Sequence, residues 1–146
     1  MEKATLRLMF TLPQEDQDYL KLQGWQWETI GSGNQQWLLI HNWPLPAGFS
    51  TKHTDLALLI TQGYPTAPLD MAYFNPDLVL EGGRSFPPNT RLSATPIDGK
   101  NYQRWSKHRQ AGTNEWRPGI DSIRTHLLFI TAFLADTVSG NSRSGS

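Results

Sequence analysis

The hydrophobic positions near the N-terminus predict a short helix that follows an extended segment over residues 5–11. Pro13 suits a first helical turn, the acidic Glu15, Asp16 and Asp18 suit the positive end of the helix dipole, and Gly24 can end the helix. The predicted helix therefore covers residues 13–23. Its expected buried contacts are Leu12, Tyr19, Leu20 and Leu22.

Three strands are predicted next. Residues 25–30 and 37–43 are rich in apolar and aromatic side chains, and the turn sequence at residues 31–34 joins them as a hairpin. Residues 54–61 form a third strand after another short turn, so the three strands are expected to make an antiparallel meander. Four tryptophans are expected to pack this meander: Trp25, Trp27, Trp37 and Trp43.

The remaining chain divides into a loop-rich part and a helix. Proline and glycine interrupt residues 63–95, which leaves room only for brief strands such as residues 70–74. Apolar residues then recur at a spacing of three and four, which predicts an amphipathic helix over residues 122–136 with Asp121 as a candidate N-cap. Residues 139–146 contain little that can be buried, so we expect one domain over residues 1–138 and a flexible tail.

Composition excludes several classes of protein. A chain of 146 residues has the size of one domain, and its 13 basic and 13 acidic residues create no overall field toward nucleic acid or an anionic membrane. The N-terminus is too short and too polar for a secretory signal, and no apolar run approaches the roughly 20 residues of a membrane-spanning helix. We therefore expect a cytoplasmic protein.

The absence of cysteine restricts the chemistry more than it restricts the compartment. It removes disulfides, thiolate metal sites and thiol nucleophiles, so covalent catalysis would need an oxygen or nitrogen nucleophile. The four histidines are scattered without metal-ligand spacing, and we predict no zinc site and no cofactor. His41 and His53 are interpreted as structural or solvated.

Two short motifs carry a resemblance to a known family. The turn Tyr64-Pro65-Thr66-Ala67-Pro68 after the third strand, and Trp116-Arg117-Pro118 before the last helix, resemble those of the ubiquitin-conjugating enzymes over residues 13–136. Further segments resemble a divergent bacterial branch called family E. They are Leu69-Asp70-Met71, Trp105-Ser106-Lys107-His108 and Trp116-Arg117-Pro118-Gly119.

This resemblance implies both a fold and a function. The fold is α+β, with an N-terminal helix, an antiparallel β-meander, a long active-site loop and a C-terminal helix. The function is a carrier step in ubiquitin-like transfer. The implied partners are a ubiquitin-like protein, an activating enzyme and a metalloprotease that removes the modifier.

The chain departs from the family pattern where the catalytic cysteine should be. The His-Pro-Asn motif and the cysteine are both missing, and the equivalent window, residues 99–109, has hydroxyls only at Tyr102 and Ser106. Ser106 is the better candidate for an ester-linked carrier. A serine hydroxyl is far less acidic than a thiol and needs a neighbouring base. His108 would share a face with Ser106 in an extended segment, whereas in a helix His126 becomes the better base.

Other residues have supporting roles in this hypothesis. A carboxylate would orient the histidine, and the candidates are Asp70, Asp98 and Asp121. An amide would stabilise the oxyanion, as the missing asparagine does in the eukaryotic family, and the candidates are Asn101 and Asn114. The residues expected to shape the site are Tyr64, Pro65, Trp105, Trp116 and Pro118.

Three alternatives stay open. Loss of the cysteine and of His-Pro-Asn also fits a noncatalytic module that binds a ubiquitin-like protein or an activating enzyme. A cysteine-to-serine replacement at position 106 would give the same sequence. Basic and aromatic residues could instead form a nucleic-acid patch, which the neutral net charge disfavours. That patch would contain Lys100, Arg104, Lys107, Arg109 and Arg117 with Tyr102, Trp105 and Trp116.

Overall fold

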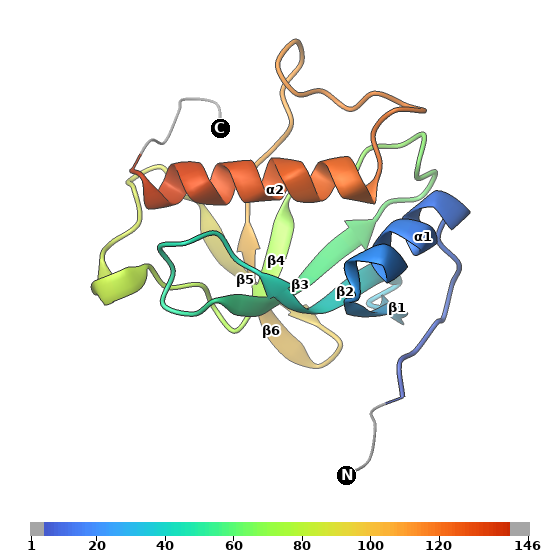
Figure 1. Cartoon of the computed structure of the whole chain (residues 1–146), viewed down its shortest axis with the longest axis horizontal. Helices are drawn as coiled ribbons and strands as arrows, with labels where there is room; N and C mark the ends of the chain where they lie inside the picture. The colour runs from blue at the N-terminus through green and yellow to red at the C-terminus, as the bar shows by residue number, and fades with distance from the viewer. Residues whose placement is uncertain (1–4, 141–146) are drawn as a thin grey trace.

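The computed structural model describes residues 5–140; the remaining residues, which include 141–146 of the predicted tail, lie outside the described part. Figure 1 shows helices packed on a sheet, with a long loop that projects before the last helix. In chain order the elements are α1 (Gln14–Gln23), β1 (Gln26–Ser32), β2 (Gln35–Pro44), β3 (His53–Ile60), β4 (Ala72–Asn75), η1 (Glu81–Gly83), β5 (Leu92–Ile97), β6 (Lys100–Trp105) and α2 (Ile123–Val138).

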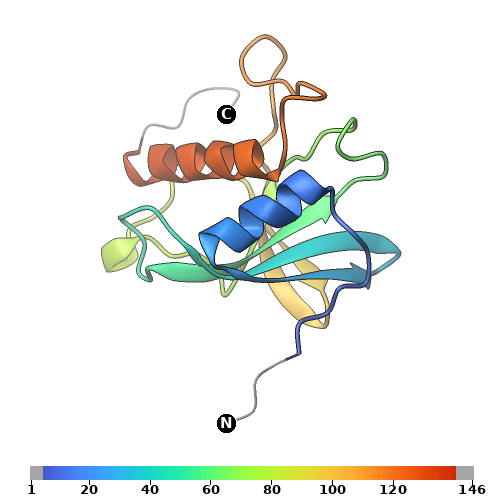
Figure 2. The same ribbon diagram turned by 45° about the vertical axis from the view of Figure 1, so that its right-hand side comes forward.

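The sheet is antiparallel throughout, with the strand order β1-β2-β3-β4-β6-β5. Its first three strands are neighbours in sequence and in space, which confirms the predicted meander. Both helices lie against the same face, and Figure 2 shows α1 beside α2. The α+β class and the element order of the ubiquitin-conjugating fold are therefore confirmed.

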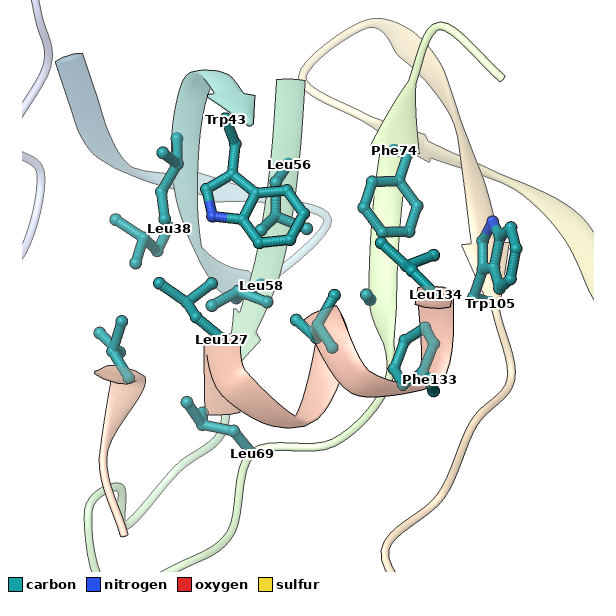
Figure 3. Close-up of a cluster of buried hydrophobic side chains, with 14 of the residues drawn as sticks. Leu38, Trp43, Leu56, Leu58, Leu69, Phe74, Trp105, Leu127, Phe133 and Leu134 are labelled. Atoms are coloured by element: carbon teal, nitrogen blue, oxygen red, sulfur yellow. The ribbon is translucent and has the colours of Figure 1, made fainter. Parts of the chain in front are cut away.

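The main core lies between α2 and the sheet. Apolar side chains on the buried stripe of α2 meet the inward positions of the strands, because a helix buries residues three and four apart while a strand buries alternate ones. Figure 3 shows α2 side chains such as Leu127, Phe133 and Leu134 facing strand residues that include Leu38, Leu56, Leu58 and Phe74.

A second apolar cluster covers the opposite face of the sheet. It explains why β2 is apolar without alternation, since Trp37 and Leu39 are buried on one face while Leu38 and Ile40 are buried on the other. The buried members of the second cluster are Ile30, Trp37, Leu39, Ala57, Tyr73, Ile97 and Tyr102.

The sheet curls so that its two ends meet at Arg7. The Arg7 guanidinium lies 2.8 Å from Glu28 of β1 and 2.8 Å from Asp98 in the turn between β5 and β6. The backbone N–H of Asp98 also donates to the Ser32 hydroxyl at 3.1 Å. Burial opposes ionisation of Glu28, but hydrogen bonds from Arg7 and His41 hold its pKa at about 2. We call Arg7, Glu28 and Asp98 the Arg7 clamp.

The β5–β6 hairpin corrects the prediction for the middle of the chain. Asp98 and Gly99 both have positive φ, which is the geometry of a tight hairpin turn, and Asp-Gly is a strong signal for it. The prediction treated residues 63–95 as mostly loop, whereas β5 begins at Leu92 and, as an edge strand, tolerates its proline at position 96. The predicted active-site window, residues 99–109, is therefore mostly strand, and the long loop runs over residues 106–122.

Details of the two helices also differ from the prediction. Leu22 is 83% exposed, whereas Asp16 is buried, so the inner face of α1 is rotated from the expected one. Helix α2 begins at Ile123 with Ser122 rather than Asp121 as its N-cap, and the backbone N–H of Ser122 donates to the Thr125 hydroxyl at 2.9 Å. Asp121 instead forms a salt bridge with Arg117.

Candidate functional site

Ser106 lies where β6 ends and the long loop begins. Its backbone N–H donates to the carbonyl of Arg91 at 3.0 Å, and the N–H of Lys107 donates to the carbonyl of Trp105 at 2.9 Å, which closes a tight turn around Ser106. The residue is half-buried, and its hydroxyl makes no hydrogen bond to residues 5–140. Because the chain turns here, the expectation that Ser106 and His108 share a strand face does not apply.

Trp105 fixes the position of this turn through its packing in the core. Its side chain is fully buried, stacks on Phe133 with ring centroids 6.0 Å apart, and donates its indole N–H to Gln103 at 2.8 Å. Trp105 thus lies in the core, beneath the turn, rather than on the surface of the site. It anchors the end of β6, and the next residue is Ser106.

His108, two residues after Ser106 in the sequence, forms a hydrogen-bonded pair with Asp70. The Nδ1 atom of His108 lies 2.7 Å from Oδ2 of Asp70, and both side chains are solvent-accessible. The Nε2 atom of His108 makes no hydrogen bond to a described residue. A carboxylate on one ring nitrogen holds the tautomer in which the other nitrogen can accept a proton. The structure thus brings together one predicted histidine and one predicted orienting acid.

Asp70 is itself held in place by backbone contacts. Its Oδ1 atom accepts hydrogen bonds from the N–H groups of Met71 at 3.1 Å and Arg109 at 3.2 Å. Met71 has a positive φ of 59°, so the chain turns sharply after Asp70 and points this carboxylate toward the loop. One carboxylate therefore connects the Leu69-Asp70-Met71 segment to the start of the long loop.

Arg109 is the central anchor of the long loop. Its guanidinium donates to the carbonyls of Leu69 and Asn114 at 3.2 and 3.1 Å, and to Nδ1 of His126 at 2.9 Å. The same group lies over the rings of Trp116 and Phe129, 4.9 and 4.7 Å from their centroids. Burial lowers the pKa of Arg109 from its ordinary value. No sequence pattern predicts this anchoring role, and Arg109 enters the predictions only through the alternative nucleic-acid patch.

His126 is buried and has both ring nitrogens occupied. Nδ1 accepts from Arg109, so the ring proton lies on Nε2, which donates to the carbonyl of Met71 at 2.9 Å. Burial lowers the pKa of His126 to about 4. At neutral pH this histidine is an uncharged structural link between α2 and the loop, with no nitrogen free to serve Ser106.

Acid is expected to destabilise the fold through His126. The folded-state pKa of about 4 lies below the ordinary 6.5, so the unfolded chain binds more protons as the pH falls through this window. Lowering the pH from 6.5 to 3 should cost about 3 kcal/mol from this group, with most of that loss above pH 4 and little below pH 3. Urea denaturation of the wild type and of His126→Gln across this range measures the difference. Parallel pH profiles for the two proteins would contradict this account.

The Tyr-Pro turn is bonded to the rest of the site. The indole N–H of Trp116 donates to the carbonyl of Pro65 at 3.0 Å, and the Tyr64 hydroxyl donates to Asp16 at 2.7 Å while it accepts from the N–H of Ile123 at 3.0 Å. Burial raises the pKa of Asp16, and hydrogen bonds from Tyr64 and Ile123 oppose that shift only in part. Tyr64 and Trp116 therefore hold α1, α2 and the loop together.

A groove of about 930 Å³ lies between the long loop and α2. Its walls combine the apolar side chains of Trp116, Phe129 and the exposed Leu128 with charged groups on the loop. Asn114, a predicted oxyanion residue, lines this groove, and Pro118 lies at its wall. Ser106 is not one of the residues that line it.

Several predicted residues lie away from Ser106. Asn101 and Asp98 are at the opposite end of the β6 hairpin, and five residues of strand place Asn101 about 16 Å from Ser106. Neither can act on an ester there. Asp121 accepts hydrogen bonds from the backbone and side chain of Arg117. Burial raises the pKa of Asp121, but these hydrogen bonds bring it down to about 2.

The alternative of a nucleic-acid patch, which the net charge disfavours, loses several of its members to the core and the loop. Tyr102 and Trp105 are buried and cannot stack on bases, and Lys107 is also buried. The guanidinium of Arg109 already donates hydrogen bonds to Leu69, Asn114 and His126. His41 is a structural residue that lies 2.8 Å from Glu28, and His53 is exposed.

Comparison with known proteins identifies one match. A sequence model of prokaryotic E2 family E, a branch of the ubiquitin-conjugating superfamily, matches residues 12–137. No curated protein and no solved structure matches the chain. Within residues 5–140, no three histidine or carboxylate side chains converge as metal ligands. The same part of the chain has no helix with the length and apolarity to cross a bilayer.

Proposed function

The chain belongs to prokaryotic E2 family E, and from that membership we propose that it carries a ubiquitin-like modifier as an ester on Ser106. An activating enzyme would supply the modifier with its C-terminal carbonyl activated, and a metalloprotease of the same pathway would remove the modifier from targets. The match extends from Leu12 to Thr137 and so includes the Tyr-Pro turn, the long loop and α2.

The His108–Asp70 pair is the observation that carries this proposal. Serine needs a base to attack a carbonyl at neutral pH, and an exposed imidazole held by a carboxylate is the usual arrangement. Nε2 of His108 would take the proton of the Ser106 hydroxyl while the serine oxygen bonds to the modifier's carbonyl carbon. The bond from that carbon to its leaving group on the activating enzyme would break, and the imidazolium would return the proton to that leaving group. Asp70 stabilises the resulting imidazolium from 2.7 Å. Asn114 is the remaining amide that can contribute to the oxyanion.

The groove between the long loop and α2 would receive the C-terminal tail of the modifier. Its apolar floor, formed by Leu128 and Phe129, suits an extended peptide, and the charged residues of the loop can bind the peptide backbone. Arg109 keeps this groove open, since it ties the loop to Leu69 and to α2.

A noncatalytic binding module is the second candidate. It is favoured by one observation, namely that the groove is complete without Ser106. Such a module would hold the modifier or dock on the activating enzyme without forming a covalent bond.

One experiment separates the two candidates. The chain is incubated with the activating enzyme and the ubiquitin-like protein of its genomic neighbourhood and with ATP, and adducts are resolved by mass spectrometry. We expect an adduct that resists thiols, is cleaved by alkali and is absent in Ser106→Ala. His108→Gln should slow its formation by about 10²–10⁴-fold, the typical contribution of a positioned base.

The matched control is Ser93→Ala, which removes an exposed hydroxyl on the edge strand β5 and should leave the adduct unchanged. An alkali-labile adduct that persists in Ser106→Ala would place the ester elsewhere. Tight binding of the modifier with no adduct in the wild type would favour the binding module.

A further inference from the structure

Two arginines flank Ser106 on the face of the sheet opposite α2. The N–H of Ser106 donates to the carbonyl of Arg91 at 3.0 Å, which continues the β5–β6 ladder one residue beyond Trp105 and places Arg91 opposite Ser106. Because Trp105 points into the main core, strand alternation turns Arg104 and Ser106 to the other face. Opposite residues have Cβ atoms about 5 Å apart, and residues two apart on a strand are separated by about 7 Å. Both guanidinium groups can therefore reach the space beside the serine.

Neither arginine has a partner in the described part of the chain. Arg91 is exposed, and its guanidinium forms no hydrogen bond or ion pair with residues 5–140. Arg104 is half-buried, and its Nε atom is the one buried side-chain nitrogen or oxygen in residues 5–140 that has no hydrogen bond. A buried donor without an acceptor is unusual in a folded protein and is often completed by water or by a ligand. This donor points to an acceptor that the described chain does not supply.

The His108–Asp70 pair lies on the same side of the sheet as Arg104. Tyr73 stands opposite Arg104 in the β4–β6 ladder. Burial raises the pKa of the Tyr73 hydroxyl, Asp70 adds to that shift, and Arg104 opposes it, so both charged groups lie near this phenol. Asp70 does not pair with Arg104, because its oxygens are already bonded to His108 and to two backbone N–H groups. The positive charge beside Ser106 is therefore left uncompensated by the described residues.

The two guanidinium groups are suited to a phosphate on the reacting carbonyl. A guanidinium presents a planar fork of donors that matches phosphate oxygens, and such charge-assisted hydrogen bonds are about twice as strong as neutral ones. A carboxyl group activated as a mixed anhydride carries a phosphate on the carbon that a nucleophile attacks. A thioester carries an uncharged sulfur at that place. Two unpartnered arginines beside the nucleophile thus favour the mixed anhydride.

We propose that Arg91 and Arg104 form a phosphate site, and that the acyl donor for Ser106 is a mixed anhydride of the modifier's C-terminal carboxylate with a phosphate. The inference rests on the proposed function, because it names the leaving group of the same transfer. Oγ of Ser106 bonds to the acyl carbon, and the bond from that carbon to the phosphate oxygen breaks with its electron pair on the phosphate. His108 takes the serine proton and passes it to the departing phosphate. The two arginines stabilise the negative charge of that phosphate.

Phosphate binding is measured first, without any acyl transfer. Methyl phosphate is titrated into the full chain at constant ionic strength, because salt screens exposed charges, and the N–H resonance of Ser106 is followed by NMR. We expect a saturable shift in the wild type and binding that is at least about tenfold weaker in Arg91→Gln and in Arg104→Gln. Arg124→Gln removes an exposed arginine of α2 and is the matched control, which should bind as the wild type does. A shift that does not saturate, or equal binding in all four proteins, overturns the phosphate site.

Two synthetic donors then test the role of this site in transfer. The same short glycine-terminated peptide is offered as an acyl methyl phosphate and as a thioester, and the ester on Ser106 is measured by intact mass and peptide mapping. We expect the acyl phosphate to react faster, and each glutamine variant to reduce this preference by about tenfold to a hundredfold. Arg91→Lys should keep part of the preference, since lysine retains the charge but not the fork. Arg124→Gln should keep all of it.

The outcomes distinguish this inference from the proposed function. Equal rates with the two donors, a faster thioester reaction, or a preference that survives in both glutamine variants overturns the inference and leaves the ester on Ser106 intact. The same holds if the acyl phosphate gives no ester in a chain that does form one with the activating enzyme and ATP. Absence of the ester with both donors and with the enzymatic system contradicts both proposals. Thermal unfolding of each variant checks that a lost preference reflects the guanidinium and not the fold, and the exposed Arg91 offers the safer substitution.

Discussion

Replacing Arg109 by methionine is expected to lower the free energy of unfolding by about 4 kcal/mol, because three acceptors lose their donor at once. Two of them are the carbonyls of Leu69 and Asn114, and the third is Nδ1 of the buried His126. Methionine preserves part of the contact with Trp116 and Phe129 but supplies no N–H group. The loss therefore measures the hydrogen-bonding role of the guanidinium.

Urea denaturation monitored by tryptophan fluorescence provides the measurement for Arg109→Met. The control is Arg117→Met, which removes an arginine of the same loop whose side chain is 60% exposed and whose partner is Asp121. Asp121 is buried but keeps the backbone N–H of Arg117 as a donor, so losing the Arg117 side chain should cost less than losing that of Arg109. Equal losses in the two variants would show that Arg109 does not anchor the loop.

Truncation of Trp105 to alanine should cost about 4 kcal/mol, the usual range for a large aromatic side chain in a packed core. Its ring contacts Phe74, Phe86 and Phe133, with centroids 6.0, 5.4 and 6.0 Å away. The lost indole N–H also leaves Gln103 with one hydrogen bond fewer. Since Ser106 follows directly, we expect the carrier site to lose its geometry together with the core.

Two further variants give this prediction its internal comparison. Trp105→Phe keeps the ring contacts but not the indole N–H, so its cost should be about 1–2 kcal/mol. Trp27→Ala removes a half-buried indole and should cost less than Trp105→Ala. Denaturant midpoints of the three proteins test this order. A Trp105→Ala protein as stable as Trp27→Ala would be inconsistent with an anchoring role.

Local sequence patterns predicted the helices and the meander because their information is local. Apolar spacing of three and four placed α2 within two residues of its observed ends, and Gly24 ends α1 as expected with a positive φ of 75°. The β5–β6 hairpin was missed although Asp98-Gly99 is a strong turn signal, because the prolines and glycines of residues 63–95 were taken to leave room only for brief strands. An edge strand needs no hydrogen bond on its outer side, and its place in the sheet is a tertiary property.

Only those residues of the site that belong to a recognisable sequence motif could be predicted. The pairing of His108 with Asp70 joins positions 38 residues apart, and the anchoring of His126 by Arg109 joins a loop to a helix. No spacing rule relates such positions, so sequence reasoning could name the candidates but not choose among them. The choice of His108 over His126 as the base candidate rests on burial and on which ring nitrogen is free.

The two motifs that suggested the family prove to be physical partners. Trp116 donates to the carbonyl of Pro65, and Tyr64 lies next to Trp116 with ring centroids 6.1 Å apart. Their order in the sequence thus records a contact between the Tyr-Pro turn and the loop before α2. The same contact gives the Trp-Arg-Pro segment a structural role, and that role does not depend on a catalytic cysteine.

The Arg7 clamp bears on the order in which the chain folds. It joins residues up to 91 positions apart, whereas β1, β2 and β3 pair with their sequence neighbours. Contacts of long sequence separation must first overcome the entropy of loop closure, so they form after local pairings. We therefore expect the meander to appear early and the two ends of the sheet to join late. Substitutions at Arg7 should accelerate unfolding while leaving the folding rate nearly unchanged.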